Sequence, residues 1–166
     1  MGPDANPPGA TADEERLAGI AGELADRVEE VVPGWIERLV LDRVRDWSGH
    51  VSAEVAAEAV MAAEAARADA VPQMRALLSA DIDHQRGNPL EVLRRTTRHA
   101  HDALARIGVP SVVRDDFSER SFPGDSYGLM PATWSDVDPS LHDLGLTWGA
   151  AKAYVHKARR RAEGAT

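Results

Sequence analysis

The stretch NPLEVLRRTTRHAHDALARIG, residues 88–108, decides the fold class because signals for a helix boundary stand at both of its ends. Asn88 can cap a helix, Pro89 suits the first helical position, and Glu91 stands where a capping box places its acid. Gly108 and Pro110 end the pattern. Between these signals an apolar stripe recurs at helical spacing: Leu90, Leu93, Thr97, Ala100, Leu104 and Ile107. The sequence therefore predicts one continuous helix over 88–107, with this stripe buried.

Helical periodicity extends through the first half of the chain. Apolar residues recur every three or four positions over 17–31, and again over 35–47 with Trp47 facing inward. Pro33 and Gly34 are expected to end or kink the first of these helices. Residues 53–70 form an alanine-rich helix behind a Ser52 cap, and Pro72 is expected to break or kink this helix near Ala70.

The predicted fold class is all-α, an antiparallel bundle of four to six helices that closes with a helix from about 147 to 162. The chain has 166 residues, which suits one domain. Residues 1–12 are rich in Pro and Gly and are expected to be a disordered leader. Residues 13–162 are then a single helical domain, and residues 163–166 are a tail.

Residues 109–145 differ from the rest, because no helical or alternating period persists in them. They hold four of the eight aromatic residues, namely Phe117, Phe122, Tyr127 and Trp134. Loops of this length are usually functional or disordered, and the aromatic residues argue against disorder. We expect an irregular, aromatic-rich cap with short helical turns near 112–120 and 131–136. This cap either covers one end of the bundle or forms a specific site.

Composition excludes several classes of protein. The absence of cysteine excludes disulfide scaffolds, thiolate nucleophiles and cysteine-ligated metals. No apolar run is long enough to span a bilayer and no basic leader is present, which predicts a cytoplasmic protein without membrane contact. Alanine and arginine, both with GC-rich codons, are abundant and indicate a high-GC bacterium. Residues 109–161 resemble conserved proteins of actinobacteria, a resemblance that implies no activity.

One catalytic pattern occurs in the sequence, but its surroundings do not fit the chemistry. Residues 124–128, GDSYG, match the G-x-S-x-G nucleophile elbow and resemble the Gly-Asp-Ser block of certain lipases and esterases. That chemistry needs a strand before the serine, and none is predicted here. Asp138 and His142 stand four apart, whereas the resemblance requires three. A polar turn explains the motif, so no catalytic residue is assigned.

No cofactor or metal site is expected from the sequence. His99 and His101 are two positions apart on a helix, so their side chains point in different directions and cannot share one ion. Asp81, Asp83 and His84 cluster in a loop, which is ordinary for a turn. No phosphate-binding loop or dinucleotide-binding glycine pattern occurs either.

Charge segregation suggests how the protein interacts. Net charge is −8 overall, yet the helix at 88–107 carries two basic rows on the face away from the leucine stripe. These rows can pair with acidic helices of the same chain, with a protein partner, or with phosphates, but the overall negative charge opposes nucleic acid. The candidate interaction residues are Arg94, Arg95, Arg98, His101, Phe117, Arg120, Tyr127 and Trp134.

The leading hypothesis is a non-enzymatic interaction or regulatory protein that binds a protein partner or a second copy of itself. One alternative is a nucleic-acid-binding module that uses the basic face of 88–107 and the C-terminal arginines. Another is a small enzyme with a pocket beneath residues 109–145. For that enzyme the candidate polar groups are Arg114, Asp115, Asp116, Arg120 and Tyr127.

Overall fold

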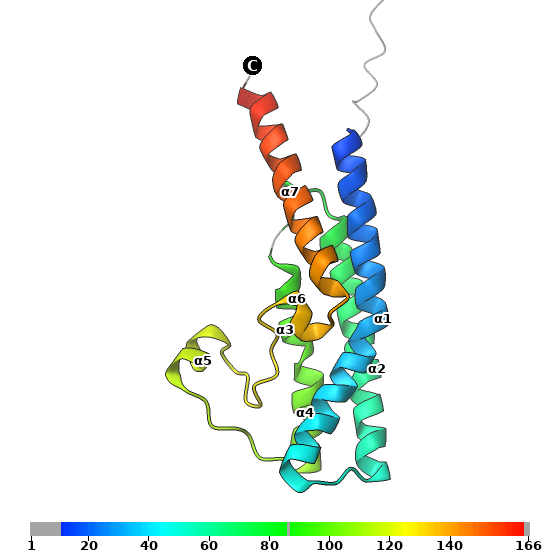
Figure 1. Cartoon of the computed structure of the whole chain (residues 1–166), viewed down its shortest axis with the longest axis vertical. Helices are drawn as coiled ribbons and strands as arrows, with labels where there is room; N and C mark the ends of the chain where they lie inside the picture. Colours follow the sequence, from blue (N-terminus) through cyan, green and yellow to red (C-terminus); the bar gives the residue numbers. More distant parts are fainter. Residues whose placement is uncertain (1–10, 86, 165–166) are drawn as a thin grey trace, which may run out of the picture.

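A computed structural model of the protein describes residues 11–85 and 87–164, and the regular structure within these ranges is entirely helical (Figure 1). The helices are α1 (Ala12–Ser48), α2 (Ala53–Ser79), α3 (Pro89–Thr96), α4 (Arg98–Ile107), α5 (Asp116–Ser121), α6 (Trp134–Val137) and α7 (Leu141–Gly164). The all-α prediction is confirmed. Most of the leader predicted at 1–12 lies outside the described residues. Of the part that is described, Thr11 caps α1 and residue 12 begins it.

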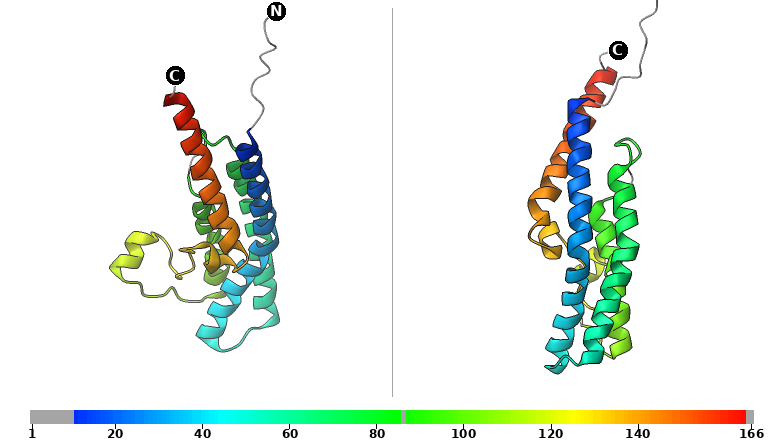
Figure 2. Two further views of the ribbon diagram at one scale, coloured as in Figure 1. Left: turned by 45° about the horizontal axis from the view of Figure 1, so that its top comes forward. Right: turned by 90° about the vertical axis from the view of Figure 1, so that its right-hand side faces the viewer.

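Two long helices, α1 and α2, lie side by side and reverse the chain at residues 49–52 (Figures 1 and 2). The side chain of Thr11 accepts a hydrogen bond from the Glu14 amide, and that of Ser52 accepts one from Val55. Such caps satisfy backbone donors that a helix start leaves free. Helix α7 packs on α1, while α3 and α4 pack on α2. This arrangement covers the pair of long helices on more than one side.

Both long helices continue through a proline, so neither Pro33 nor Pro72 ends its helix, and the predicted helix ends at these two places are wrong. A proline inside a helix costs about 3 kcal/mol. Val32 and Ile36, on either side of Pro33, are fully buried, and so is Ala70 beside Pro72. Burying each large aliphatic side chain contributes about 1.5–3 kcal/mol. Core packing on both sides of the proline therefore outweighs the local penalty.

The single helix predicted over 88–107 is two helices, because the chain leaves regular helix at Thr97. The hydroxyl of Thr96 donates to the carbonyl of Val92 at 2.7 Å, and that of Thr97 donates to Arg94 at 2.6 Å. Hydroxyls that bond to helix carbonyls in this way bend helices. The predicted stripe is buried as expected, apart from the half-buried Ile107. Asn88 caps α3, but Glu91 pairs with Arg94 and does not complete a capping box.

Three smaller predictions also need correction. Trp47 is half exposed and does not face the core. The short turns are α5 and α6, which begin later than predicted and end one residue beyond 120 and 136, respectively. Helix α7 begins six residues before 147 and continues past 162 to Gly164. Its early start follows from packing, since Leu141 is fully buried and the indole of Trp134 lies against Gly145.

A continuous hydrophobic core joins α1, α2, α3, α4 and α7 and reaches residues of the irregular segment such as Leu129. Its largest fully buried side chains include Leu24, Ile36, Met74 and Leu93. Within the described ranges, no helix combines the length and hydropathy needed to cross a bilayer.

Candidate functional site

Residues 109–133, here named the arm, leave the end of α4, carry α5 out to the side and return to α6 (Figure 1). Figure 2 shows α5 standing away from the other helices in its left-hand view. No residue of α5 is buried. The outer part of the arm around α5 therefore stands away from the packed helices, while its base contributes Val109, Tyr127 and Leu129 to the core.

The first contact that holds the arm is a buried carboxylate at its base. Asp125 is 3% exposed, and its side chain accepts hydrogen bonds from the amides of Leu129 at 2.7 Å and Met130 at 3.0 Å. Its Oδ1 also lies 3.1 Å from Nε2 of His101 on α4. Burial raises the pKa of Asp125, but the three hydrogen bonds outweigh burial and the net pKa is lowered. An ionised Asp125 thus ties the returning limb of the arm to α4.

Tyr127 supplies a second contact between the two limbs of the arm. Its hydroxyl donates to the carbonyl of Val109 at 2.8 Å, and its ring lies 5.6 Å from the imidazole of His101. The backbone amide of Val112 donates to Ser126 at 3.0 Å, which joins the limbs again. Glycine at position 128 permits this turn, because its φ is +67°.

Two arginines organise the outer part of the arm. The Arg114 guanidinium is almost buried and donates to the carbonyls of Ser118 and Phe122, the latter at 2.7 Å. Arg94 on α3 donates to the Pro131 carbonyl at 2.8 Å and stacks over the Phe122 ring at 5.4 Å. Each guanidinium donates to backbone carbonyls of the arm. The arm is consequently held in one shape by its own polar groups.

The tip of the arm exposes apolar side chains to solvent. Val113 is 102% exposed and Phe117 is 73% exposed. Around Phe117 lie the exposed acids Asp115, Asp116 and Glu119. The amide of Ser118 donates to Asp115 and lowers its pKa, which keeps this carboxylate charged. An exposed aromatic ring on an ordered support, bordered by negative charge, is the most distinctive surface feature of the described chain.

The basic rows predicted on 88–107 are largely paired within the chain. Arg98 and His99 both contact Asp69 of α2, at 2.8 Å and 2.9 Å, and Arg106 contacts Glu58 at 3.2 Å. Of the candidate interaction residues, Arg94, Arg98 and His101 hold internal contacts, and Tyr127 and Trp134 are buried. Arg95, Phe117 and Arg120 are exposed. The structure brings together His101 and Tyr127, whose rings lie 5.6 Å apart.

The contacts of residues 124–128 described above hold the backbone of the arm in place. Asp125 uses its carboxylate to hold backbone amides, and His101 faces Asp125 instead of a serine. Among the described residues, no group of three or more His, Asp or Glu side chains is arranged to hold a metal ion. A cavity of about 500 Å³ does occur, but it lies between α1, α2 and α7, not beneath residues 109–145. The rim of that cavity carries Arg159, which contacts Glu14, Asp81 and Asp83.

Comparison with known proteins identifies no relative: no model of a known protein family matches the chain, and neither curated proteins nor solved structures show significant similarity to it.

Sequence reasoning missed Asp125, Gln85 and Arg159 as organising residues. Asp125 stands between two turn glycines, Gly124 and Gly128, and that spacing was a usable signal for a carboxylate that caps a turn. Nothing local marked Gln85 or Arg159. Their partners lie on other elements or depend on how the loop at 80–87 folds.

Proposed function

We propose that this protein is a non-enzymatic interaction protein, and that its arm docks Phe117 into an apolar pocket with a basic rim on a partner protein. The observation that carries the proposal is the exposure of Phe117 on an ordered arm. Exposed aromatic anchors on rigid supports dominate the binding energy of many protein interfaces. In the same proposal the packed helices form an antiparallel bundle that acts as the scaffold, in the cytoplasm.

The charge around the ring determines the chemistry of the partner. Asp115, Asp116 and Glu119 outnumber Arg120 on the exposed surface around α5, although Arg114 pairs with Glu119 at 3.3 Å. Complementary charge accelerates association and suppresses wrong partners. A basic rim is therefore favoured over an acidic one, and nucleic acid is disfavoured because phosphates would meet the same carboxylates.

Preorganisation supports the same conclusion. Arg114, Asp125 and Tyr127 hold the arm before any partner arrives. Less conformational entropy is then lost on binding, which raises affinity for a given contact area. The pairing of Arg98 with Asp69 leaves less unpaired positive charge on α4 for a polyanion, although the Arg98 side chain remains exposed.

Site-specific crosslinking tests this proposal. Phe117 is replaced by a photoreactive benzoylphenylalanine in living cells, and Leu146 on α7, which is 58% exposed, receives the same group as a matched control. We expect one major adduct from position 117 that is absent from position 146. The partner protein captured at position 117 is then identified and purified, and its affinity for the wild-type chain is measured.

The variants that follow make the result specific. Phe117→Ala should weaken binding at least about a hundredfold, as for an interface anchor, and leave the melting temperature unchanged. Asp116→Lys should slow association and reverse its salt dependence. Absence of an adduct at 117, or equal adducts at 117 and 146, would overturn the proposal. If the adduct contains a second copy of this chain, the arm docks on another copy of the protein and not on a different partner.

A further inference from the structure

The cavity between α1, α2 and α7 is created by small side chains on one face of α1. Ala18, Ala21, Gly22 and Ala25 recur at helical spacing along its wall. Longer side chains at these positions would fill the space between the helices. The cavity measures about 500 Å³, within the range of about 300–1,000 Å³ that is typical of small-molecule sites.

Its inner surface is apolar and contributed by three helices and a loop. Leu17 and Ala21 come from α1, Leu78 from α2, Ile82 from the loop that follows, and Val155 from α7. All five belong to the hydrophobic core. An apolar ligand body would gain about 25 cal/mol for each Å² that it removes from water here.

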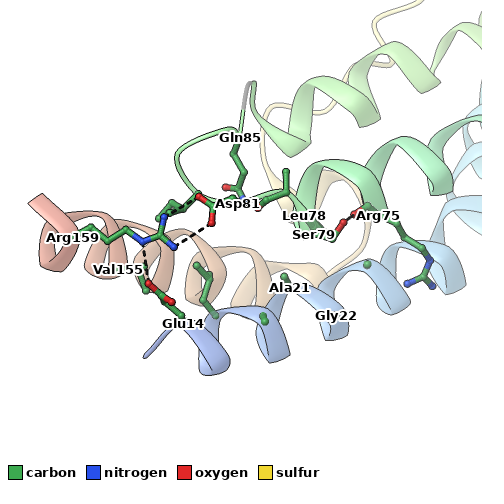
Figure 3. A pocket seen from close by; sticks show the side chains of 15 residues that line it. Glu14, Ala21, Gly22, Arg75, Leu78, Ser79, Asp81, Gln85, Val155 and Arg159 are labelled. Carbon is green, nitrogen blue, oxygen red and sulfur yellow. Dashed lines mark hydrogen bonds and ion pairs between the residues drawn. The ribbon is translucent and has the colours of Figure 1, made fainter. Parts of the chain in front are cut away.

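One polar atom inside this region is left without a donor. The Oε1 of Gln85 is buried and accepts no hydrogen bond from the described part of the chain. Its Nε2 donates to the Ala80 carbonyl at 3.0 Å, which fixes the amide so that the oxygen is the free group. In Figure 3 the side chain of Gln85 lies beside Asp81 and points toward the space between α1 and the end of α2. A buried acceptor without a donor costs about 1–3 kcal/mol, so a ligand that donates to it gains affinity.

Arg75 lines one end of the cavity, and the mouth at the opposite end, beside α7, carries an excess of negative charge. Arg159 of α7 contacts Glu14 at 3.0 Å and both Asp81 and Asp83 at 2.9 Å (Figure 3 shows the first two). Three carboxylates therefore surround one guanidinium. The hydrogen bond from Arg159 lowers the pKa of Asp81, so this carboxylate stays ionised at neutral pH. A cation is favoured at this mouth and an anion is opposed.

From this geometry we propose that the cavity binds a small amphiphilic amine. The apolar body lies against Leu17, Leu78 and Val155, and the ammonium head donates to Gln85 Oε1 beside the carboxylate of Asp81. The proposal is independent of partner docking by the arm, which leaves the packed helices on another side.

Calorimetry with the full chain tests the proposal, with octylamine as the probe and octanol and octanoate as analogues of the same chain length. Octylamine is expected to bind at least about tenfold more tightly than octanoate. Its ammonium group donates a charged hydrogen bond, and the negative charge at the mouth attracts it and repels octanoate. Gln85→Met should weaken octylamine binding about tenfold and octanol binding less, because the neutral hydroxyl donates a weaker hydrogen bond to the same oxygen. Binding of octanoate as tight as that of octylamine, or no effect of Gln85→Met, would overturn the head-group assignment.

A matched pair of glycine variants locates the site. Gly22 lines the cavity and a Cβ there meets nothing within 4 Å, so Gly22→Leu should fill the space and weaken octylamine binding at least about tenfold. Gly19 lies on the same helix with equal free space, but it does not line the cavity. Gly19→Leu should therefore bind as the wild type does. Equal losses in both variants, or no octylamine binding by the wild type, would overturn the proposal. Phe117→Ala should leave octylamine binding unchanged, which separates this test from that of the arm.

Discussion

The Oδ1 atom of Asp125 lies 3.1 Å from Nε2 of His101, a contact between residues 24 positions apart that joins the arm to α4. The same carboxylate accepts from the amides of Leu129 and Met130, so one side chain connects a helix to the returning limb of the arm. Asp125 therefore anchors the base of the arm that carries Phe117, without a hydrogen bond to Phe117 itself.

Removing Asp125 should destabilise the protein. Asp125→Ala leaves buried amides without an acceptor, and we expect the free energy of unfolding to fall by roughly 2–4 kcal/mol. Asp116→Ala is the matched control, because that carboxylate is exposed, and it should change stability by less than about 0.5 kcal/mol. Urea denaturation measures both. A double-mutant cycle with His101→Ala should give a coupling of about 1–3 kcal/mol, and a value near zero would contradict the contact.

Acidification should destabilise the native state through Asp69 and Asp125. The hydrogen bond from His99 lowers the pKa of Asp69, and the hydrogen bonds of Asp125 outweigh its burial and lower its pKa also. Both carboxyls bind protons more weakly in the folded than in the unfolded chain. Their stabilising effect is thus complete above the unfolded pKa and is lost as the pH falls, between about pH 5 and pH 2.

The measurement is the free energy of unfolding across this pH range. Asp125→Asn cannot titrate, so its stability should decline less steeply with acid than that of the wild type. Asp116→Asn serves as the control and should keep the wild-type slope, because no buried contact depends on its charge. If Asp125→Asn and the wild type decline in parallel, Asp125 does not carry the effect.

Gly145 should tolerate no side chain. A Cβ at this position would lie 2.3 Å from Nε1 of Trp134, so Gly145→Ala forces the indole or the helix to move. We expect a loss of about 1–3 kcal/mol, as for other overpacked cores. Gly149 lies one turn later in α7 with no atom within 4 Å of a Cβ, and Gly149→Ala should gain up to about 1 kcal/mol from helix propensity. Thermal denaturation distinguishes the two, and a gain in both would show that Trp134 does not pack there.

Replacing the proline inside α2 should stabilise the protein. Pro72 is exposed and cannot donate a helical hydrogen bond, so Pro72→Ala should recover about 1–2 kcal/mol after the greater freedom of the unfolded chain is subtracted. Pro110 is also exposed but lies outside any helix, and Pro110→Ala should be neutral or lose up to about 1 kcal/mol. Chemical denaturation measures both changes. If Pro72→Ala destabilises the protein and Pro110→Ala stabilises it, α2 breaks at Pro72 in solution.

The helices themselves were predictable because the interactions that form them are local. The cap at Asn88, the cap at Ser52 and the stripe from Leu90 to Leu104 depend on residues within four positions of each other, and all were confirmed. Such spacing is visible in one dimension. The split at Thr97 also depends on local interactions. However, bonds from threonine hydroxyls to helix carbonyls are weak, so the sequence pattern does not show whether they interrupt the helix.

The tertiary structure decided what local patterns left open. Continuation through Pro33 depends on burial against other helices, and the cavity wall at Ala21 becomes a site only when α2 and α7 face it. The arm shows no periodic pattern in the sequence because long-range pairs, such as His101 with Asp125 and Val109 with Tyr127, hold it in place. Residue spacing does not reveal such pairs. Local hydrogen bonds select helices residue by residue, whereas burial and long-range pairing exist only after the helices have packed.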